Sequence, residues 1–188
     1  MITSLFDTKI LNVIEKDFAE INEEIKNTLP QLKLLKKDNW GSTHFLSTLD
    51  FQQDYIADNN LTLLQKSIDN NVKEYCTFVK YRYNDYKMTS WVSWYKQNDY
   101  AHTHNHGNAD ISGVYYVQTN GKDGNIFFTS PCPAAETSKI QIEHKESYRY
   151  IPKNGLMLLF PGYLNHGVQR NTTEDDRVCI SFNIYFND

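Results

Sequence analysis

The hydrophobic pattern of this chain changes near Tyr86, and that change limits the folds available to it. Before Tyr86, apolar residues recur every third or fourth position, which is typical of amphipathic helices. After Tyr86, they alternate with polar residues, which is typical of strands with one buried face. The last segment shows the alternation most clearly, with one wholly apolar face formed by Val178, Ile180, Phe182, Ile184 and Phe186.

Short strand-like segments fill the second half of the chain. They cover residues 88–96, 111–117, 126–129, 140–150, 156–160, 166–169 and 178–186, and turn residues such as Asn120-Gly121 and Asn154-Gly155 separate them. No helical pattern alternates with these strands, so we expect antiparallel sheets rather than a parallel α/β fold. The pattern predicts a mainly β protein with N-terminal helices, built as a jelly roll or cupin-like double-stranded β-helix.

Two amphipathic helices are predicted before the strands. The first covers residues 10–29 and ends at Pro30, because proline cannot continue a helix. The second is expected to begin after a cap at Asn60, with a buried face of Leu61, Leu64, Ile68, Val72, Tyr75 and Val79. We therefore expect one domain over residues 1–188, in which residues 1–85 form a helical support for a β core at 86–188.

Composition excludes some classes of protein. The formal net charge is −4, which argues against a nucleic-acid partner. Three widely spaced cysteines without a CxxC pair indicate reduced thiols rather than a disulfide framework. Neither a signal peptide nor an apolar run of membrane-spanning length is recognisable, so we expect a cytoplasmic protein without a membrane partner.

Three of the six histidines, His102, His104 and His106, fall within five positions. In an extended backbone, residues two apart project to the same side, so His104 and His106 converge, and His102 is able to join them. Converging neutral imidazoles are suited to a transition metal, and His166 offers a distant third ligand. A three-ligand site with open positions indicates catalysis rather than structure. The alternative is a solvated surface cluster.

Arg177 follows His166 by eleven residues, at the head of the last strand. A buried guanidinium needs a partner, and the terminal carboxylate of a dianionic ligand would provide one. The alternative is an ordinary ion pair with Asp175 or Asp176.

Several motifs together resemble the Fe(II)/2-oxoglutarate-dependent oxygenases, and most of all the prolyl-hydroxylase-like group of bacteria and phages. The matching segments follow one another along the chain: His104-Asn-His106, Ser112-Gly-Val-Tyr-Tyr116, Gly155-Leu-Met-Leu-Leu-Phe-Pro161, Leu164-Asn-His166 and Arg177-Val-Cys-Ile-Ser-Phe-Asn183. The resemblance is strongest over residues 88–186. Agreement of several motifs in order is far more specific than any single motif.

The resemblance implies a double-stranded β-helix in which His104, His106 and His166 bind Fe(II). It implies that Arg177 pairs with the far carboxylate of the cosubstrate 2-oxoglutarate, with Tyr95 and Asn183 as further cosubstrate contacts. The implied activity is a dioxygenase reaction that consumes O₂ and 2-oxoglutarate, hydroxylates a C–H bond and releases succinate and CO₂.

The chain departs from the common family pattern at two positions. His106 stands where the family usually has Asp or Glu, and Cys179 replaces a serine that follows the arginine. The identity of the third metal ligand therefore stays open at this point, because Asp110 and His102 are alternatives to His106.

The substrate is expected to be a small molecule or a peptide. His102, Tyr100 and Asn108, with Trp91 and Trp94, are candidate substrate contacts near the predicted cavity. Two other functions stay open: a three-histidine cupin-type dioxygenase that does not use 2-oxoglutarate, and a jelly-roll binding module without catalysis. The sequence does not decide whether the protein is an oligomer.

Overall fold

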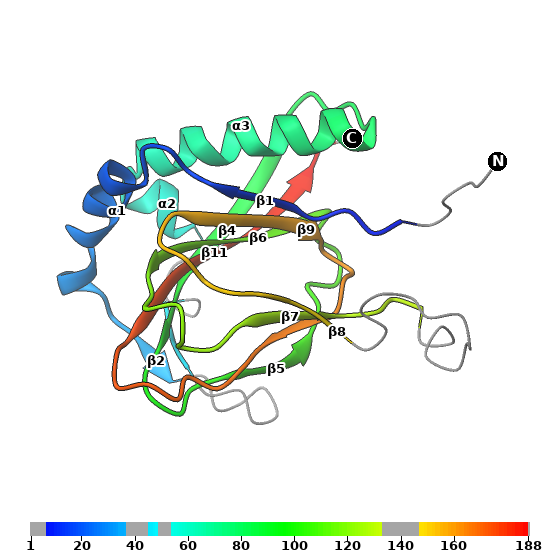
Figure 1. The fold of residues 1–188 in the computed structure, drawn as a ribbon. Helices are drawn as coiled ribbons and strands as arrows, with labels where there is room; N and C mark the ends of the chain where they lie inside the picture. The colour runs from blue at the N-terminus through cyan, green and yellow to red at the C-terminus, as the bar shows by residue number, and fades with distance from the viewer. Residues whose placement is uncertain (1–6, 37–44, 49–53, 133–146, 188) are drawn as a thin grey trace.

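A computed structural model describes residues 7–36, 45–48, 54–132 and 147–187. Two antiparallel sheets dominate this part of the chain (Figure 1). The large sheet has the strand order β1 (Leu11–Ile14), β9 (Leu156–Pro161), β6 (Ile111–Gln118), β11 (Arg177–Phe186), β4 (Tyr86–Tyr95), β3 (Leu46–Ser47) and β2 (Leu35–Lys36). The small sheet has the order β5 (Ala101–His104), β10 (His166–Val168), β7 (Ile126–Thr129) and β8 (Ser147–Tyr150).

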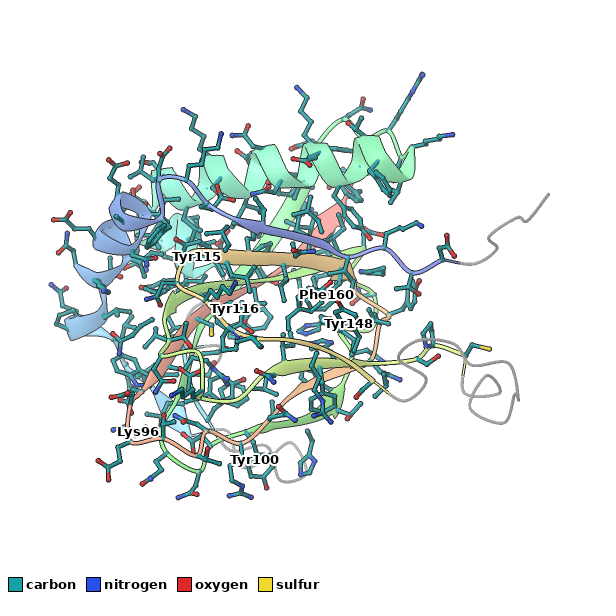
Figure 2. The ribbon with its side chains drawn as sticks, viewed as in Figure 1. Lys96, Tyr100, Tyr115, Tyr116, Tyr148 and Phe160 are labelled. Atoms are coloured by element: carbon teal, nitrogen blue, oxygen red, sulfur yellow. The ribbon has the colours of Figure 1, made fainter. Side chains whose placement is uncertain are left out.

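The helices cover the outer face of the large sheet, and the small sheet lies across its other face (Figure 1). The helices are α1 (Phe18–Lys26), α2 (Tyr55–Asp58) and α3 (Thr62–Val79), with a short 3₁₀ turn, η1, at Leu29–Gln31. One apolar cluster joins the helices to the large sheet, and a second fills the space between the sheets. Figure 2 shows Tyr116 and Phe160 in that inner layer, whereas the neighbouring Tyr115 belongs to the helix-side cluster.

Strand β11 explains how the two layers are separated. It pairs along its length with β4 and, on its other side, with β6. The apolar face, including Val178, Ile180 and Phe182, packs toward the helices, while Arg177 and Cys179 face the small sheet. The alternation of the sequence therefore predicts correctly which side chains enter the space between the sheets. The predicted mainly β, double-stranded β-helix architecture is confirmed.

The predicted first helix is only partly correct. Its first residues form strand β1, which pairs with β9 in the register Leu11 to Leu159, and helix α1 begins only at Phe18. Leu11 and Val13 occupy alternate positions of the strand, and both pack on the helix-side core. The strand is hard to recognise in the sequence because the apolar residues of 10–29, taken together, have helical spacing. The hydrogen bonds that β1 gives to β9 satisfy an otherwise open sheet edge, which favours the strand. Residues assigned to the helical support thus also contribute to the sheet.

The second helix is predicted nearly correctly, but its start is stabilised differently. Asn60 adopts a left-handed conformation with φ 53° and gives α3 no side-chain cap. Instead, the Glu24 carboxylate of α1 accepts hydrogen bonds from the backbone N–H groups of Leu63 and Leu64 and from the Thr62 hydroxyl. The expected buried face is correct except at Val79, which is 38% exposed at the helix end.

The predicted strand at 140–150 is described only as β8, Ser147–Tyr150, and its first part lies outside the described residues. Strand β5 is not among the strands that the sequence predicts, and β2, β3 and α2 lie within residues 31–58, whose mixed composition predicts no particular element. Within the described ranges, no helix combines the length and apolar character that a bilayer crossing requires.

We predict that Glu24→Ala destabilises the protein by about 1 kcal/mol, because it leaves the first N–H groups of α3 without an acceptor. In a chain of this size, that loss lowers the melting temperature by about 3 °C in a thermal melt followed by circular dichroism. Glu23→Ala, at an exposed neighbouring position, is the matched control and should leave the melting temperature unchanged. Equal melting temperatures for both variants would contradict the capping role.

Candidate metal centre

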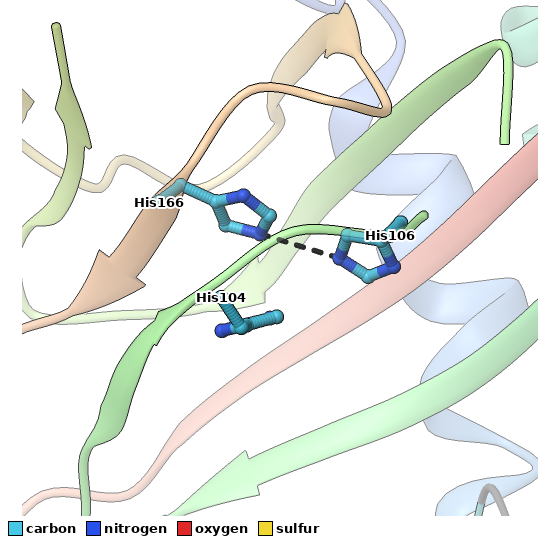
Figure 3. A group of neighbouring side chains, drawn as sticks. All are labelled: His104, His106 and His166. Carbon is cyan, nitrogen blue, oxygen red and sulfur yellow. Dashed lines mark hydrogen bonds between the residues drawn. The ribbon is translucent and has the colours of Figure 1, made fainter. Parts of the chain in front are cut away.

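Three imidazoles from two neighbouring strands converge between the sheets (Figure 3). His104 ends β5 and lies opposite His166, the first residue of β10, in the register of the small sheet. His106 follows in the turn after β5, where its backbone N–H donates to the Gly162 carbonyl at 2.9 Å. One ring nitrogen of each histidine lies within 4.8 Å of the other two. The structure thus brings together residues sixty positions apart.

A bulge in β5 decides which histidines face inward. Ala101 pairs with Val168 and His104 with His166, so three steps along β5 oppose two along β10. Ala101 and His104 therefore both face the space between the sheets, while His102 is exposed and its ring packs edge-on against Tyr100 at 5.1 Å. Simple alternation, which would place His102 beside His104, fails at this bulge.

Backbone carbonyls fix the orientation of two of the rings. Nδ1 of His104 lies 2.7 Å from the His102 carbonyl oxygen, and Nδ1 of His166 lies 2.9 Å from that of Leu164. A carbonyl only accepts hydrogen bonds, so Nδ1 carries the proton in both neutral rings and Nε2 keeps its lone pair. This arrangement is the one that metal-binding histidines usually show.

The spacing of His106 and His166 also fits a shared ion. Their Nε2 atoms are 3.3 Å apart. Two nitrogens about 2.1 Å from one ion, at angles near 90–109°, are separated by roughly 3.0–3.4 Å. Nε2 of His166 has the lone pair, so Nε2–H of His106 donates the hydrogen bond drawn between them in Figure 3, and an ion bound to both nitrogens takes the place of that proton.

Burial keeps the three imidazoles neutral. It lowers the pKa of His104, lowers that of His106 to about 4 with a contribution from His104, and lowers that of His166 well below its usual value. The charged form of each ring loses hydration in this cavity, so near neutral pH all three rings have lone pairs available.

Arg177 is the largest fully buried side chain of the cavity and forms no ion pair with the described residues. Its Nη1 donates to the carbonyl oxygens of Asp123 and Gly124, at 2.9 and 2.5 Å. Nε and Nη2 are buried without a hydrogen-bond partner among the described residues. The ring of Tyr95 lies beneath the guanidinium, 4.1 Å from its carbon. Two donor nitrogens of the guanidinium are therefore left for a ligand.

The acidic residues next to Arg177 in sequence do not pair with it. Asp176 accepts a hydrogen bond from the Trp94 indole, and Asp175 accepts one from the Asn120 amide. The alternative of an ordinary ion pair with either residue is therefore not what the structure shows.

A tight turn holds the two carbonyls that orient Arg177. The fully buried Asp123 carboxylate accepts hydrogen bonds from the Thr119 hydroxyl and from the Asn120 N–H. Gly124 has a φ of 95°, and a Cβ there would lie 2.2 Å from the Gln169 carbonyl oxygen, so only glycine fits. The turn fixes the backbone that anchors one side of the guanidinium.

One cavity joins the histidines to Arg177. Its other polar or sulfur-bearing side chains are Ser93, Tyr95, Tyr116, Cys179 and Ser181. Tyr116 was not predicted as a site residue, although it shares the inward face of β6 with Val114. Burial raises the pKa of both Tyr95 and Tyr116 above its usual value, so both phenols stay protonated and able to donate.

Among the predicted substrate contacts, the structure brings only Trp91 to the cavity. Trp91 lines it and stacks on His106 with ring centroids 5.8 Å apart. Tyr100 and Asn108 lie outside the cavity lining, as His102 does, and Trp94 packs on the helix side.

Two further candidate ligands are engaged elsewhere. Asn183 lies on the same strand face as Arg177, but outside the cavity lining, and its amide oxygen accepts a hydrogen bond from Ser112. Asp110, the alternative metal ligand, accepts a hydrogen bond from the Phe186 backbone N–H and is not part of the histidine group.

Residues 89–183, half of the chain, match the model of the family described as "Putative 2OG-Fe(II) oxygenase". The chain belongs to this family. Its members are named for Fe(II) and 2-oxoglutarate, the cofactor and cosubstrate predicted from the sequence. No curated protein sequence matches the chain.

Several solved structures share the fold at low sequence identity. A prolyl-4-hydroxylase from Pseudomonas putida is 11% identical with a TM-score of 0.67, covering 96% of this chain and 94% of its own. HygX from Streptomyces hygroscopicus, with nickel, 2-oxoglutarate and hygromycin B bound, is 12% identical with a TM-score of 0.65, covering 94% and 82%. The epimerase SnoN, in complex with Fe³⁺, α-ketoglutarate and nogalamycin RO, is 9% identical with a TM-score of 0.70, covering 95% and 79%.

We predict that a divalent metal stabilises the protein through the three histidines. Fe(II) added anaerobically at 100 times its dissociation constant should raise the free energy of unfolding by about 2.7 kcal/mol. His166→Ala should remove this gain, whereas the outward-facing His102→Ala should keep it. Thermal melts with and without metal make the comparison. A loss in His102→Ala equal to that in His166→Ala would contradict the assignment.

Proposed function

We propose that this protein is an Fe(II)- and 2-oxoglutarate-dependent dioxygenase that hydroxylates a C–H bond of its substrate and releases succinate and CO₂. One observation carries the proposal: a buried guanidinium, two of whose nitrogens have no hydrogen-bond partner among the described residues, lines the same cavity as three convergent imidazoles. A ligand that chelates a metal at one end and has a carboxylate at the other satisfies both groups. 2-Oxoglutarate is such a ligand.

In this proposal His104, His106 and His166 hold Fe(II) through their Nε2 atoms. The bound iron supplies the redox chemistry, namely activation of O₂ and the oxidative decarboxylation of 2-oxoglutarate. Three protein ligands leave room at the ion for other molecules, as catalytic sites require. The carbonyls of His102 and Leu164 hold two of the rings in the metal-binding tautomer.

Arg177 binds the far carboxylate of 2-oxoglutarate through Nε and Nη2, the two donors that the fold leaves free. Tyr95 and Tyr116 flank it as neutral phenols able to donate further hydrogen bonds to that carboxylate. Val114, Ile126 and Phe160 form apolar walls that exclude water. The exclusion of water strengthens the ionic contact between Arg177 and its ligand and limits side reactions.

The substrate is proposed to be a small molecule or a peptide that enters beside Trp91. The indole stacks on His106, so it lies directly beside one of the metal ligands. Proteins with this fold include a prolyl-4-hydroxylase, an enzyme bound to hygromycin B and an epimerase, and this range supports an oxygenase without selecting one substrate.

A second candidate is a three-histidine dioxygenase that does not use 2-oxoglutarate. The absence of a carboxylate from the described metal group favours it, and Arg177 would then bind a substrate carboxylate directly. The two functions differ in one product, because only the first forms succinate from 2-oxoglutarate.

Anaerobic addition of Fe(II) and 2-oxoglutarate tests the proposed function. We expect a weak visible charge-transfer band that needs both components, followed by one succinate per 2-oxoglutarate consumed when O₂ is admitted. Iron binding without the band, and without succinate, would exclude 2-oxoglutarate as cosubstrate and favour the second candidate.

We predict that Arg177→Gln lowers the affinity for 2-oxoglutarate by about 10- to 100-fold, because charge-assisted hydrogen bonds contribute about 1.5–3 kcal/mol. Metal binding by the histidines should persist. Arg170→Gln is the matched control, since Arg170 is exposed and lies over the Tyr100 ring outside the cavity. Calorimetric titration of the iron-loaded protein under argon measures both. Unchanged affinity in Arg177→Gln would contradict the assignment.

A further inference from the structure

The described lining of the cavity carries one permanent charge, and that charge is positive. None of its described lining residues is an aspartate or glutamate, and Arg177 is the single charged side chain. The buried carboxylate of Asp123 acts on Arg177 electrostatically, but it is directed to Thr119 and Asn120, and only the backbone carbonyl of Asp123 contacts the guanidinium. An imidazole that binds a metal ion is neutral.

A divalent ion in this cavity therefore has no anionic ligand from the described chain. The ion and Arg177 together place three positive charges between apolar walls that include Val114, Ile126 and Phe160. Burying charge without compensation is costly, and like charges in a medium of low dielectric raise that cost. A dianion that contacts the ion at one end and Arg177 at the other removes two of the three charges.

We propose that the imidazole of His106, which stands where a carboxylate would give the ion its own counter-charge, couples the affinities for the metal and for its dianionic cosubstrate more strongly than a carboxylate ligand would. The inference rests on the proposed function and concerns what His106 does to it. An aspartate at this position would give the ion its own counter-charge, so much of the coupling would be lost. Because coupling between two ligands is reciprocal, 2-oxoglutarate should tighten metal binding by the factor by which metal tightens 2-oxoglutarate binding.

Two variants at His106 separate the effect of a negatively charged ligand from the effect of side-chain shape. His106→Asp introduces a carboxylate, and His106→Asn has nearly the same shape without charge. The dissociation constant of Fe(II) is measured anaerobically by competition with a chromophoric chelator, with and without saturating 2-oxoglutarate, in the two variants and the unaltered protein. Circular dichroism verifies that each variant is folded.

We expect 2-oxoglutarate to tighten Fe(II) binding by about 100-fold in the unaltered protein and by a similar factor in His106→Asn. In His106→Asp, the factor should be about tenfold smaller. Equal factors in His106→Asp and His106→Asn would overturn the coupling while leaving the proposed function intact. If 2-oxoglutarate leaves Fe(II) affinity unchanged in all three proteins, the proposed function fails together with the inference.

A measurement on the unaltered protein keeps the inference testable if His106→Asp does not fold. 2-Oxobutyrate has the chelating end of 2-oxoglutarate but lacks the second carboxylate, so it leaves Arg177 uncompensated. It should tighten Fe(II) binding by a factor about tenfold smaller than 2-oxoglutarate does. Equal tightening by the two acids would overturn the inference.

Discussion

The structure of the site depends on one buried positive charge that forms no ion pair with any described residue. Arg177 is 1% exposed, two carbonyls anchor Nη1, and Nε and Nη2 have no hydrogen-bond partner in the part of the chain that the structure describes. Burial of such a group is destabilising unless an anion pairs with it. A purely structural role does not explain its position, because Asp175 and Asp176 are nearby in sequence and are engaged elsewhere. This position supports the proposal that the guanidinium pairs with an anionic ligand.

The sheet topology explains how the guanidinium and the histidines reach one cavity. Strand β11 runs through the middle of the large sheet, and Arg177 pairs across it with Tyr95 of β4. The histidines come from the small sheet and the adjoining turn, through the pairing of His104 with His166. Each sheet thus supplies one half of the site, and the inner apolar cluster holds the halves at a fixed separation. Rigid strands on both sides favour a preorganised site.

The sequence predicts much of this arrangement because β alternation and motif spacing are local signals. The inward face of β11 and the approach of His166 to His104 and His106 were expected from these signals. The features that were missed depend on tertiary pairing. The bulge that turns His102 outward follows from the register between β5 and β10. Strand β1 forms because β9 offers it an open edge, and no pattern within 10–29 reveals that edge. Asn183 shares the face of Arg177, but lies beyond the end of the cavity.

The site differs from the usual family pattern because His106 stands where a carboxylate is expected. In our proposal the three histidine ligands bring no negative charge to the metal, so the molecules that bind in the cavity supply it. The central claim is that one ligand spans from the three histidines to Arg177. Anomalous diffraction at the iron edge, from crystals grown anaerobically with Fe(II) and 2-oxoglutarate, tests this claim most directly. The account predicts an iron peak bonded to Nε2 of His104, His106 and His166, with the far carboxylate of 2-oxoglutarate on Nε and Nη2 of Arg177. Iron bound elsewhere, or a 2-oxoglutarate molecule that does not touch Arg177, would contradict it.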